Sequence, residues 1–461
     1  MKTEERRMHR RAQEERGRLM TEGSIWRQLV RFSIPLLIGN LFQQFYNTVD
    51  SIVVGNFVST QALAAVGSTT VIINTIIGFF TGLSTGAGVV ISQAYGAQDH
   101  RRVQDAVHTT LLFTVLSGIV FSFIGVAAAP AMLSLMTTPH DVLADAERYL
   151  EIYFSGACTV ILYNMGSGIL RAVGDSRRPL YFLIVSALLN VVLDLLFVIA
   201  FGMGVAGVAI ATVISQGVSA VLVLLALSKS HESYRLRVRE LRIHGPMLVR
   251  VLALGMPAAI QMMVTAFSNV FVQGYINHFG SACMAGWSSY LKIDQFVMLP
   301  MQAIGIAATT FVGQNIGAHN IRRAEAGTRT SLALAVGITL TLSALLIAFA
   351  RPLLMLFTPD ADVLDYGVLF IRTNTPFLCI CCLNQVFSGS LRGAGDTKAP
   401  TVIMLSSFVV FRQVYLFVIS RVLPGSVQAV SLGYPLGWVL CSLLAFLYYW
   451  KSGWRERACG L

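Results

Sequence analysis

The chain has 461 residues, of which 55% are hydrophobic and only 12% are charged, and its formal net charge is +11. A soluble domain usually carries about 25% charged residues, so this composition excludes an ordinary soluble fold and favours a membrane protein. The basic residues are spread over many short segments, whereas a nucleic-acid-binding protein gathers them in one patch. We therefore expect the lipid bilayer as a partner and no nucleic acid.

The first 24 residues are polar and strongly charged. We predict that 1–24 is a cytoplasmic tail, and no cleavable signal peptide is visible in it. Met20 lies just before the apolar sequence and is an alternative start.

Twelve apolar runs follow, and each is long enough for a bilayer-spanning helix, which needs about 20 residues. The first six runs cover 27–54, 62–95, 104–129, 142–171, 179–201 and 204–228. The second six cover 247–277, 283–315, 323–350, 362–392, 400–422 and 426–450. Glycines such as Gly82 and Gly86 in the second run indicate close packing between helix backbones. The pattern predicts an all-α membrane protein with twelve transmembrane helices.

The distribution of lysine and arginine predicts the orientation, because cytoplasmic loops carry the excess of basic residues. The N-terminal tail, the loops near 101, 175, 240, 322 and 396 and the C-terminus hold 28 of the 34 basic residues. The opposite loops and outer span halves hold four. We expect a plasma-membrane protein with both termini in the cytoplasm, which requires an even number of spans.

The two halves of the chain resemble each other in a nearly constant register. Pro35 corresponds to Pro257, and residues 170–179 (LRAVGDSRRP) match residues 391–400 (LRGAGDTKAP). Six spans is an even number, so the two copies have parallel topology. This predicts two six-helix bundles around a central cavity. The predicted domains are an N-lobe (25–228), a cytoplasmic linker (229–246), a C-lobe (247–450) and a cytoplasmic tail (451–461).

Polar side chains inside the N-terminal spans are candidate functional residues, because such groups are costly in lipid. Asp50 lies in the first span, and Asn190 and Asp194 lie four residues apart on the fifth, where they share a helix face. Thr212 on the sixth span can add a hydroxyl oxygen. Together these groups can hold a proton or share a small cation. The alternative is that each aspartate is a helix cap or a neutral packing group.

The C-terminal spans carry Lys292 and Asp294 on the eighth span and Arg412 on the eleventh. Arg412 falls roughly where the repeat places the counterpart of Asn190. These residues either form a charged cavity wall that helps to switch states or serve as structural ion pairs.

Pro35 interrupts the first span and predicts a kink in the helix that carries Asp50. The kink is either a switch element or a fixed bend. Aromatic and methionine side chains are candidates for the cavity lining, and plain lipid or core packing is the alternative that we favour. They are Phe42, Tyr46, Met262 and Met263.

Enzyme and metal sites are not expected. The cluster of Cys379, Cys381 and Cys382 lacks a second ligand pair and a nearby histidine. The sequence has no HExxH motif, no serine–histidine arrangement and no clustered carboxylates for magnesium. We predict a protein that is not an enzyme and has no cofactor.

The chain resembles the multidrug and toxic compound extrusion (MATE) family from about residue 21 to 450. The features that carry the resemblance are Pro35, Asp50 followed by Gly55, Gln93 with Gly96-Ala97, and the repeated Leu-Arg-x-x-Gly-Asp-x-x-x-Pro. The resemblance implies a secondary antiporter that exports organic, often cationic, compounds in exchange for H+ or Na+ by rocker-switch motion, and we expect it to act as a monomer. A flippase for lipid-linked or amphiphilic substrates, as in the same superfamily, is the alternative.

The resemblance also implies an ion-coupling site in the N-lobe. The family's residues match Asp50, Asn190, Asp194 and Thr212, which could hold Na+, and Tyr149 matches a tyrosine near that site. Thr265 or a neighbour stands where the NorM-like branch has a glutamate, so a sodium site in the C-lobe is not expected. The chain is more similar to the DinF-like and MepA-like branches.

Overall fold

The structure is a computed structural model that describes residues 19–136 and 139–459. Nearly all of these residues are helical, and no strand occurs in the described ranges. The chain divides into two compact units. Unit 1 contains Ile34–Ala259, and unit 2 contains Met20–Ser33 together with the residues from Ile260 onward.

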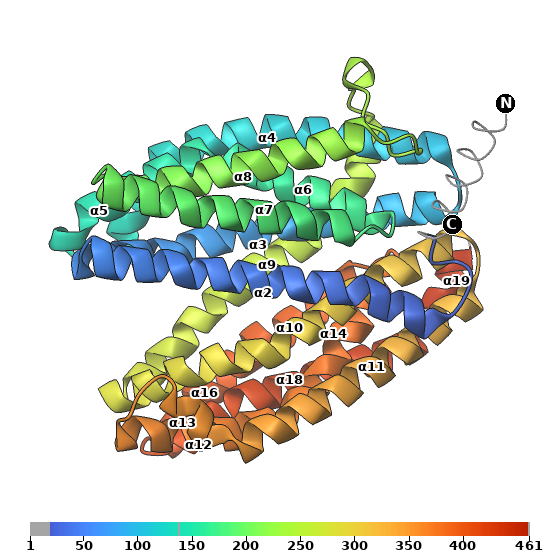
Figure 1. Cartoon of the computed structure of the whole chain (residues 1–461). Coiled ribbons are helices and arrows are strands. Elements are labelled where there is room, and N and C mark those ends of the chain that lie inside the picture. The colour runs from blue at the N-terminus through green and yellow to red at the C-terminus, as the bar shows by residue number, and fades with distance from the viewer. Residues whose placement is uncertain (1–18, 137–138, 460–461) are drawn as a thin grey trace. The chain divides into compact units, whose positions relative to one another are not determined.

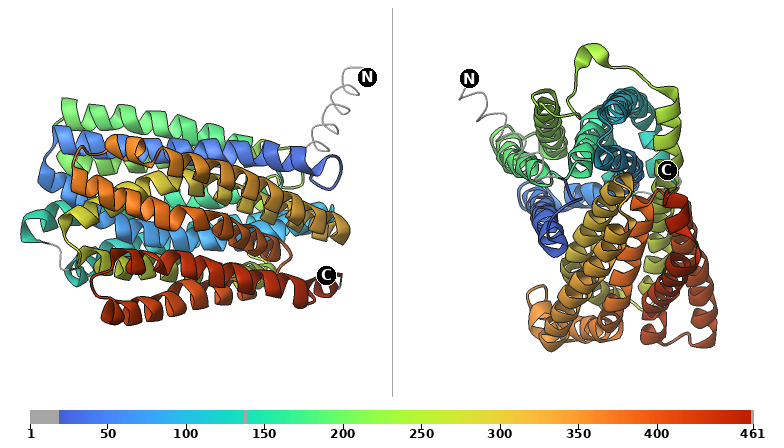
Figure 2. Two further views of the ribbon diagram at one scale, coloured as in Figure 1. Left: turned by 90° about the horizontal axis from the view of Figure 1, so that it is seen from below. Right: turned by 90° about the vertical axis from the view of Figure 1, so that its right-hand side faces the viewer.

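Unit 1 is a bundle of long helices that run alongside one another (Figures 1 and 2). Polar caps fix some of the helix starts: Ser59 accepts a hydrogen bond from the Ala62 amide at α3, and Asp99 accepts one from the Arg102 amide at α4. The helices that contribute to unit 1 are α2 (Ile25–Phe57), α3 (Thr60–Gly96), α4 (His100–Leu135), α5 (His140–Ser155), α6 (Ala157–Ala172), α7 (Arg177–Asp194), η1 (Leu195–Ala200), α8 (Gly204–Ser228), η2 (Val238–Glu240) and the first part of α9 (Gly245–Asn277).

Unit 2 is built from the remaining helices. Its core contains a cluster of aromatic rings, in which Trp287 packs against Tyr290, Phe370 and Tyr434 with ring centroids 4.9 to 5.4 Å apart. The helices are α10 (Ser281–Gly317), α11 (Ile321–Ala348), α12 (Ala350–Met355), α13 (Ala361–Asn374), η3 (Thr375–Phe377), α14 (Leu378–Gly393), α15 (Lys398–Leu405), η4 (Ser406–Phe411), α16 (Arg412–Val422), α17 (Val427–Ser431), α18 (Gly433–Lys451) and α19 (Trp454–Cys459).

Each of the twelve predicted spans falls mainly on helical residues. Within the described part of the chain, ten helical segments are long and apolar enough to cross a membrane. The other two predicted spans coincide with α2 and with the α5–α6 pair. α2 carries many amide and hydroxyl side chains, and a break at Gly156 leaves α5 and α6 as two short helices.

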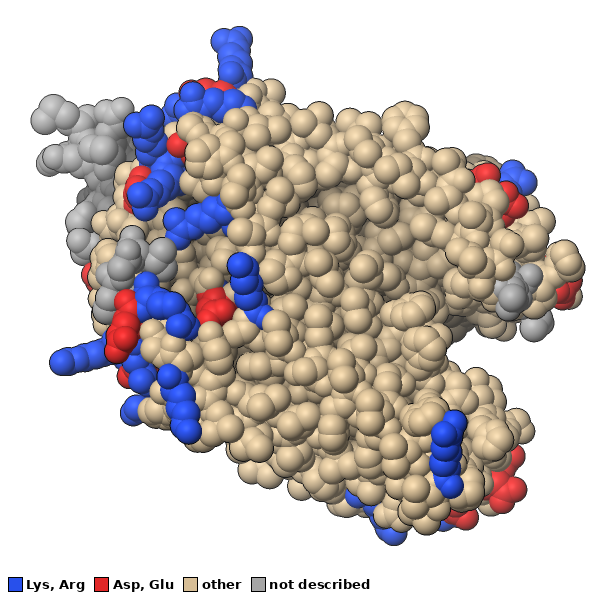
Figure 3. Space-filling model, turned by 180° about the vertical axis from the view of Figure 1, so that it is seen from behind, with Lys and Arg blue, Asp and Glu red and all other residues tan. Residues whose placement is uncertain are grey.

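The charged side chains are distributed as a bilayer requires. On the face drawn in Figure 3, Lys and Arg gather toward the ends of the helices, and the surface between them is almost entirely uncharged. Lipid tails can solvate such a surface, whereas charged side chains need water or headgroups.

The boundaries of the two units differ from those of the two sequence halves, and the difference lies near the start of each half. The beginning of α2, up to Ser33, belongs to unit 2, and α9 belongs to unit 1 as far as Ala259. In each of these helices, the point where the chain passes from one unit to the other lies next to a proline. The prolines are Pro35 in α2 and Pro257 in α9. Proline removes one backbone hydrogen bond, so each helix can bend close to the residue where its packing partner changes.

Hydrogen bonds hold the segment before α2 in unit 2. The Met20 amide donates to Gln314 Oε1 at 2.8 Å, and the Met20 carbonyl accepts from Asn315 Nδ2 at 3.1 Å and Arg323 Nε at 3.2 Å. Arg323 also donates to Gln28 Oε1 at 3.0 Å. Residues 1–18 of the predicted tail lie outside the described residues, but Met20 itself is buried in unit 2. The predicted cytoplasmic location of the tail stays a prediction.

The predicted linker packs against unit 1, where hydrogen bonds to α4 hold it in place. The Arg237 amide donates to His108 Nε2 and the His244 amide donates to Thr109 Oγ1, each at 3.0 Å. Tyr234 of the linker is fully buried and packs against Tyr95. These contacts fix the entry of the chain into α9.

The crossing of α3 and α9 inside unit 1 depends on small residues. A Cβ atom added at Gly86 would lie 2.3 Å from the Gly255 amide nitrogen, and one added at Gly82 would lie 2.3 Å from Ala259 Cα. The neighbouring atoms belong to the backbone, so they cannot move aside as a side chain can. The packing role of the glycines in this stretch is therefore confirmed.

We predict that Gly86→Ala destabilises unit 1 by about 2 kcal/mol or more, because the two helix backbones must separate to admit the methyl group. Thermal unfolding in detergent measures the effect. Gly88→Ala is the matched control, since a Cβ at Gly88 would meet its nearest neighbour only at 3.9 Å. Equal melting temperatures for the two variants would contradict the close crossing.

We predict that Arg323→Ala loosens Met20–Ser33, because the substitution removes donors to both Met20 and Gln28. Hydrogen exchange of the backbone amides in 20–33 should rise several-fold relative to the parent protein. Arg322→Ala is the control, because it removes the exposed arginine next to Arg323 in the chain. Unchanged exchange in Arg323→Ala would show that apolar packing alone holds the segment.

Candidate functional site

The predicted ion-coupling residues lie together in unit 1. Their helices are neighbours, since α5 and α7 both pack against α8. Asp50 lies on α2, Tyr149 on α5, Asn190 and Asp194 on α7, and Thr212 on α8. We call these five residues and their polar neighbours the acidic cluster.

Two carboxyl groups meet at the centre of the acidic cluster. Asp50 and Asp194 lie close enough for their carboxyl groups to interact directly. Because an ionised carboxylate can only accept hydrogen bonds, a bond between two such groups requires a proton on one of them. Asp194 is completely buried and Asp50 is half-buried. The pair is therefore suited to take up a proton or another positive charge.

The acidic cluster contains an unusual number of polar atoms without partners. No donor or acceptor in the described residues bonds to Asp50 Oδ1, to either side-chain oxygen of Asp194, or to the side-chain nitrogen and oxygen of Asn190. Asn190 is only 2% exposed. Buried polar groups are normally hydrogen-bonded, and exceptions often mark a site for an ion or for catalysis. A cation that bound here would satisfy the oxygens.

Tyrosine and hydroxyl groups complete the acidic cluster. Tyr149 is buried, lies beside Thr212 and interacts electrostatically with both aspartates. Thr212 donates its own hydroxyl hydrogen to the Val208 carbonyl at 3.0 Å, which leaves its lone pairs free to accept. Tyr46 on α2 also interacts with Asp50. The structure thus places Tyr46 beside the predicted ion site, whereas the sequence suggested it only as cavity lining.

Two members of the acidic cluster were missed by the sequence analysis. Gln216 is buried, lies beside the Tyr46 hydroxyl and has an unpartnered Oε1. Tyr153 stacks on Tyr149 with ring centroids 6.4 Å apart. Gln216 follows Thr212 by one helical turn, and Tyr153 follows Tyr149 in the same way. The i to i+4 spacing that pairs Asn190 with Asp194 would have identified both.

The donor set of the acidic cluster consists of carboxylate, amide and hydroxyl oxygens. Such oxygens suit a proton or a hard cation such as Na+, whereas transition metals prefer imidazole and thiolate ligands. Across the described ranges, no group of three or more His, Cys, Asp or Glu side chains lies close enough together to hold a metal ion.

The charged candidates of unit 2 do not form ion pairs among themselves in the described structure. Asp294 is 6% exposed and accepts a hydrogen bond from Tyr290 at 3.2 Å. Lys292 is exposed and lies over the Phe357 ring, with its nitrogen 5.5 Å from the ring centroid. Arg412 is 3% exposed and bonds to neutral oxygens. Among the described residues, these three side chains take part in no ion pair, and their role stays a prediction.

The remaining candidates are placed as follows. Phe42 on α2 and Met262 on α9 are half-buried, and Met263 is 37% exposed. Pro35 lies inside α2, as predicted. Thr265, where the NorM-like branch has a glutamate, is half-buried on α9 with an unpartnered hydroxyl. A role of these residues in transport stays a prediction.

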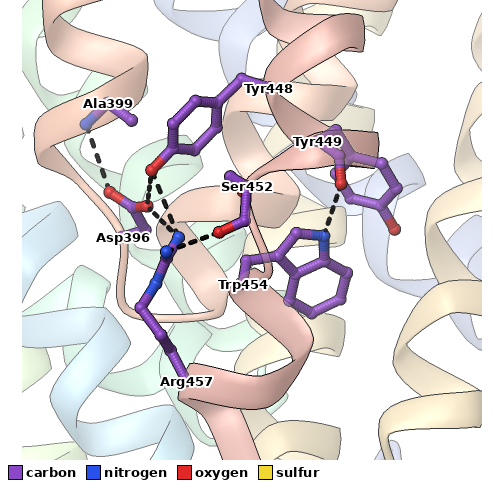
Figure 4. A network of polar contacts seen from close by, with 7 residues as sticks. All are labelled: Asp396, Ala399, Tyr448, Tyr449, Ser452, Trp454 and Arg457. Carbon is purple, nitrogen blue, oxygen red and sulfur yellow. Dashed lines mark hydrogen bonds and ion pairs between the residues drawn. The ribbon is translucent and has the colours of Figure 1, made fainter.

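The aspartates of the repeated Gly-Asp motif have a structural role that contrasts with the acidic cluster. Asp396 accepts hydrogen bonds from the Ala399 amide, from the Tyr448 hydroxyl at 2.6 Å and from Arg457 at 3.2 Å (Figure 4). Its counterpart Asp175 accepts from the amides of Arg177 and Arg178, each at 3.1 Å. Both motifs therefore cap the start of the following helix.

The repeat and the helix arrangement match a known family model. The MatE model matches the chain twice, over residues 35–196 and 257–418, so the two matched segments begin at Pro35 and Pro257. The chain belongs to the MatE (MATE) family. The family predicted from the sequence is thus confirmed, and the family consists of transporters.

Named relatives match over almost their whole length. The chain is 31% identical over 441 residues to the probable multidrug resistance protein YoeA of Bacillus subtilis, covering 94% of this chain and 95% of the relative. It is 30% identical over 435 residues to the probable multidrug resistance protein YpnP of the same organism, covering 94% and 97%. The placement of this MATE protein among the branches stays a prediction.

Solved structures show the same fold. A MOP superfamily transporter from Pyrococcus furiosus superposes with a TM-score of 0.88 at 23% identity, covering 96% of this chain and 98% of the other. The predicted all-α membrane fold with two repeated halves is confirmed for this MATE protein.

We predict opposite effects of removing two buried or partly buried charges from this MATE protein. Asp194→Asn should stabilise it by about 1 kcal/mol or more, because the amide relieves repulsion from Asp50 and no described donor is lost. Asp396→Asn should destabilise it by a similar amount, because the carboxylate accepts three hydrogen bonds. Melting temperatures in detergent at neutral pH, without added sodium, test the pair. A loss of stability in Asp194→Asn would show that the acidic cluster is a structural network.

Proposed function

We propose that this protein is a secondary active efflux antiporter that exchanges organic, often cationic, compounds for H+ or Na+. Membership of the MATE family and the multidrug resistance names of its relatives support the transported class. The acidic cluster of unit 1 supports the coupling to a cation. The protein acts as a monomer in the plasma membrane with both termini in the cytoplasm, and the uneven distribution of basic residues supports that orientation.

One observation carries the proposal: the buried carboxyl pair of Asp50 and Asp194 with its unpartnered oxygens. Taking an ionised carboxylate out of water is costly unless a positive charge compensates it. A bound proton or sodium ion supplies that charge. When the ion leaves, the uncompensated charge favours a conformation that readmits water or admits a cationic substrate.

Coupling follows if the ion and the substrate favour different conformations. On the side where the ion binds, neutralisation of Asp50 and Asp194 lets α2 pack more tightly against α7 and α8. On the other side, release of the ion restores the negative charge that attracts an organic cation. Pro35 precedes Asp50 on the same helix, α2, so a bend there can transmit the change along the helix.

The rocker-switch motion of two bundles around a central cavity is part of this proposal. The parallel repeat supports it, because two similar bundles can alternate the side of the membrane to which a bound substrate is exposed. The flippase alternative is not favoured, since the named relatives are multidrug resistance proteins.

We predict that Asp50→Asn abolishes ion-driven efflux, because the amide cannot bind a proton and binds sodium weakly. The measurement is efflux of a fluorescent organic cation from proteoliposomes, first with an imposed pH gradient and then with a sodium gradient. The parent protein should respond to at least one gradient, and the responding gradient identifies the coupling ion. The response of the variant to that gradient should be at least about tenfold smaller than that of the parent protein. A tenfold reduction corresponds to a loss of about 1.4 kcal/mol of coupling free energy.

Asp365→Asn is the matched control, because Asp365 is an exposed carboxylate that pairs with Arg351 at 3.1 Å. It should retain the full response to the gradient. Full ion-driven efflux by Asp50→Asn would refute the assignment. Stimulated movement of labelled lipid without dye efflux in the parent protein would favour the flippase.

A further inference from the structure

The repeat allows each residue of the acidic cluster to be compared with its counterpart in unit 2. The matched segments pair Pro35 with Pro257 at their start and residue 196 with residue 418 at their end. In this register, Asp50 corresponds to Val272 and Asp194 corresponds to Leu416. Asn190 corresponds to Arg412. Both carboxyl groups are therefore replaced by apolar side chains, and the neutral amide is replaced by a cation.

The counterpart residues form an equivalent arrangement inside unit 2. In the same register, Tyr46 corresponds to Ser268 and Thr212 corresponds to Tyr434. Arg412 Nη2 donates to Ser268 Oγ at 2.9 Å, and the guanidinium lies 4.8 Å from the centroid of the Tyr434 ring. Thus α9, α16 and α18 in unit 2 bring together the positions that α2, α7 and α8 bring together in unit 1.

The apolar replacements are buried around the helix that carries Arg412. Val272 is 2% exposed and Leu416 is fully buried, and both belong to one hydrophobic cluster with Trp438. Trp438 is the counterpart of Gln216 in the same register. The polar groups that could bind an exchangeable cation in unit 1 are thus absent from these positions in unit 2.

Arg412 is stabilised by neutral groups only, as far as the described residues show. Besides Ser268, Nη2 donates to Asn269 Oδ1 at 2.8 Å, and the Tyr434 ring offers its negative face. Ser268 in turn donates to the Phe408 carbonyl in the π-helical turn η4. Asp294 interacts with Tyr434 but forms no ion pair with Arg412. A guanidinium group keeps its positive charge in a protein at any physiological pH.

We propose that Arg412 is a resident cation that takes, in unit 2, the place that the exchangeable ion takes in unit 1. The inference rests on the proposed function for its second part: ions are exchanged only at the acidic cluster, and Arg412 keeps its charge through the transport cycle. A covalently attached cation holds α9, α16 and α18 together without an ion that can leave. The packing of these three helices around Arg412 therefore does not depend on an ion that binds and leaves, whereas the packing around the acidic cluster does.

The test replaces the attached cation by a free one. Arg412→Ala should lower the melting temperature by several degrees, and millimolar methylguanidinium should restore most of the loss, because it fits the vacated place and carries the same donors. Tetramethylammonium at equal concentration is the control for ionic strength. Arg372→Ala is the control variant, because Arg372 is exposed in the same unit, and methylguanidinium should leave its melting temperature unchanged.

A second pair of variants separates charge from packing and also covers the case in which Arg412→Ala does not fold. Arg412→Lys keeps the positive charge and should retain most of the stability and dye efflux. Arg412→Gln keeps a polar side chain without charge and should lose both. The proposal is overturned if Arg412→Gln behaves like the parent protein, or if methylguanidinium restores Arg412→Ala no better than tetramethylammonium.

The stability readout does not depend on ion coupling, so the two proposals fail in different ways. Full ion-driven efflux by Asp50→Asn refutes the proposed function and leaves the methylguanidinium result interpretable. Coupling-ion binding to the double variant Asp50→Asn/Asp194→Asn tests the second part. No specific binding is expected there, and a retained binding site would show that ions are exchanged outside the acidic cluster.

Discussion

The close approach of Asp50 and Asp194 is the constraint on which the rest of the structure depends. Two carboxyl groups in a buried site repel each other unless a positive charge lies between them or on one of them. Hydrogen-bond donors from the protein usually compensate such groups, as they do at the half-buried Asp396. In unit 1 the described residues supply no donor to Asp194. This lack of donors is the observation on which the proposed ion site rests.

The surrounding helices explain how such a site can persist. Close backbone contacts, such as the one between Gly86 and Gly255, stabilise unit 1 away from the acidic cluster. The hydrogen bonds between the linker and α4 stabilise unit 1 further. Stability gained in these regions can offset the cost of unpartnered polar atoms at Asn190 and Asp194.

The comparison of the two units shows how a duplicated bundle can acquire two roles. The backbone positions are equivalent, but one unit has carboxyl groups where the other has Val272 and Leu416. A carboxyl pair can bind a positive charge and release it, whereas the Arg412 guanidinium is always present. Near Pro35 and Pro257, each sequence half contributes a short segment to the unit that is built mainly from the other half. The helices α2 and α9 therefore each have residues in both units.

The sequence by itself determined the membrane class, the twelve helical segments, the repeat and the identity of Asp50, Asn190 and Asp194 as candidates, because hydropathy, periodicity and internal similarity are local properties of the chain. Only the tertiary structure decided which side chains share a site. It added Tyr46, Gln216 and Tyr153 to the acidic cluster, and among the described residues it gave Arg412 neutral hydrogen-bond partners. It also assigned Met20–Ser33 to unit 2. The physical reason is that contacts between distant helices depend on how the helices cross, and the hydrophobic pattern of a single helix does not specify that crossing.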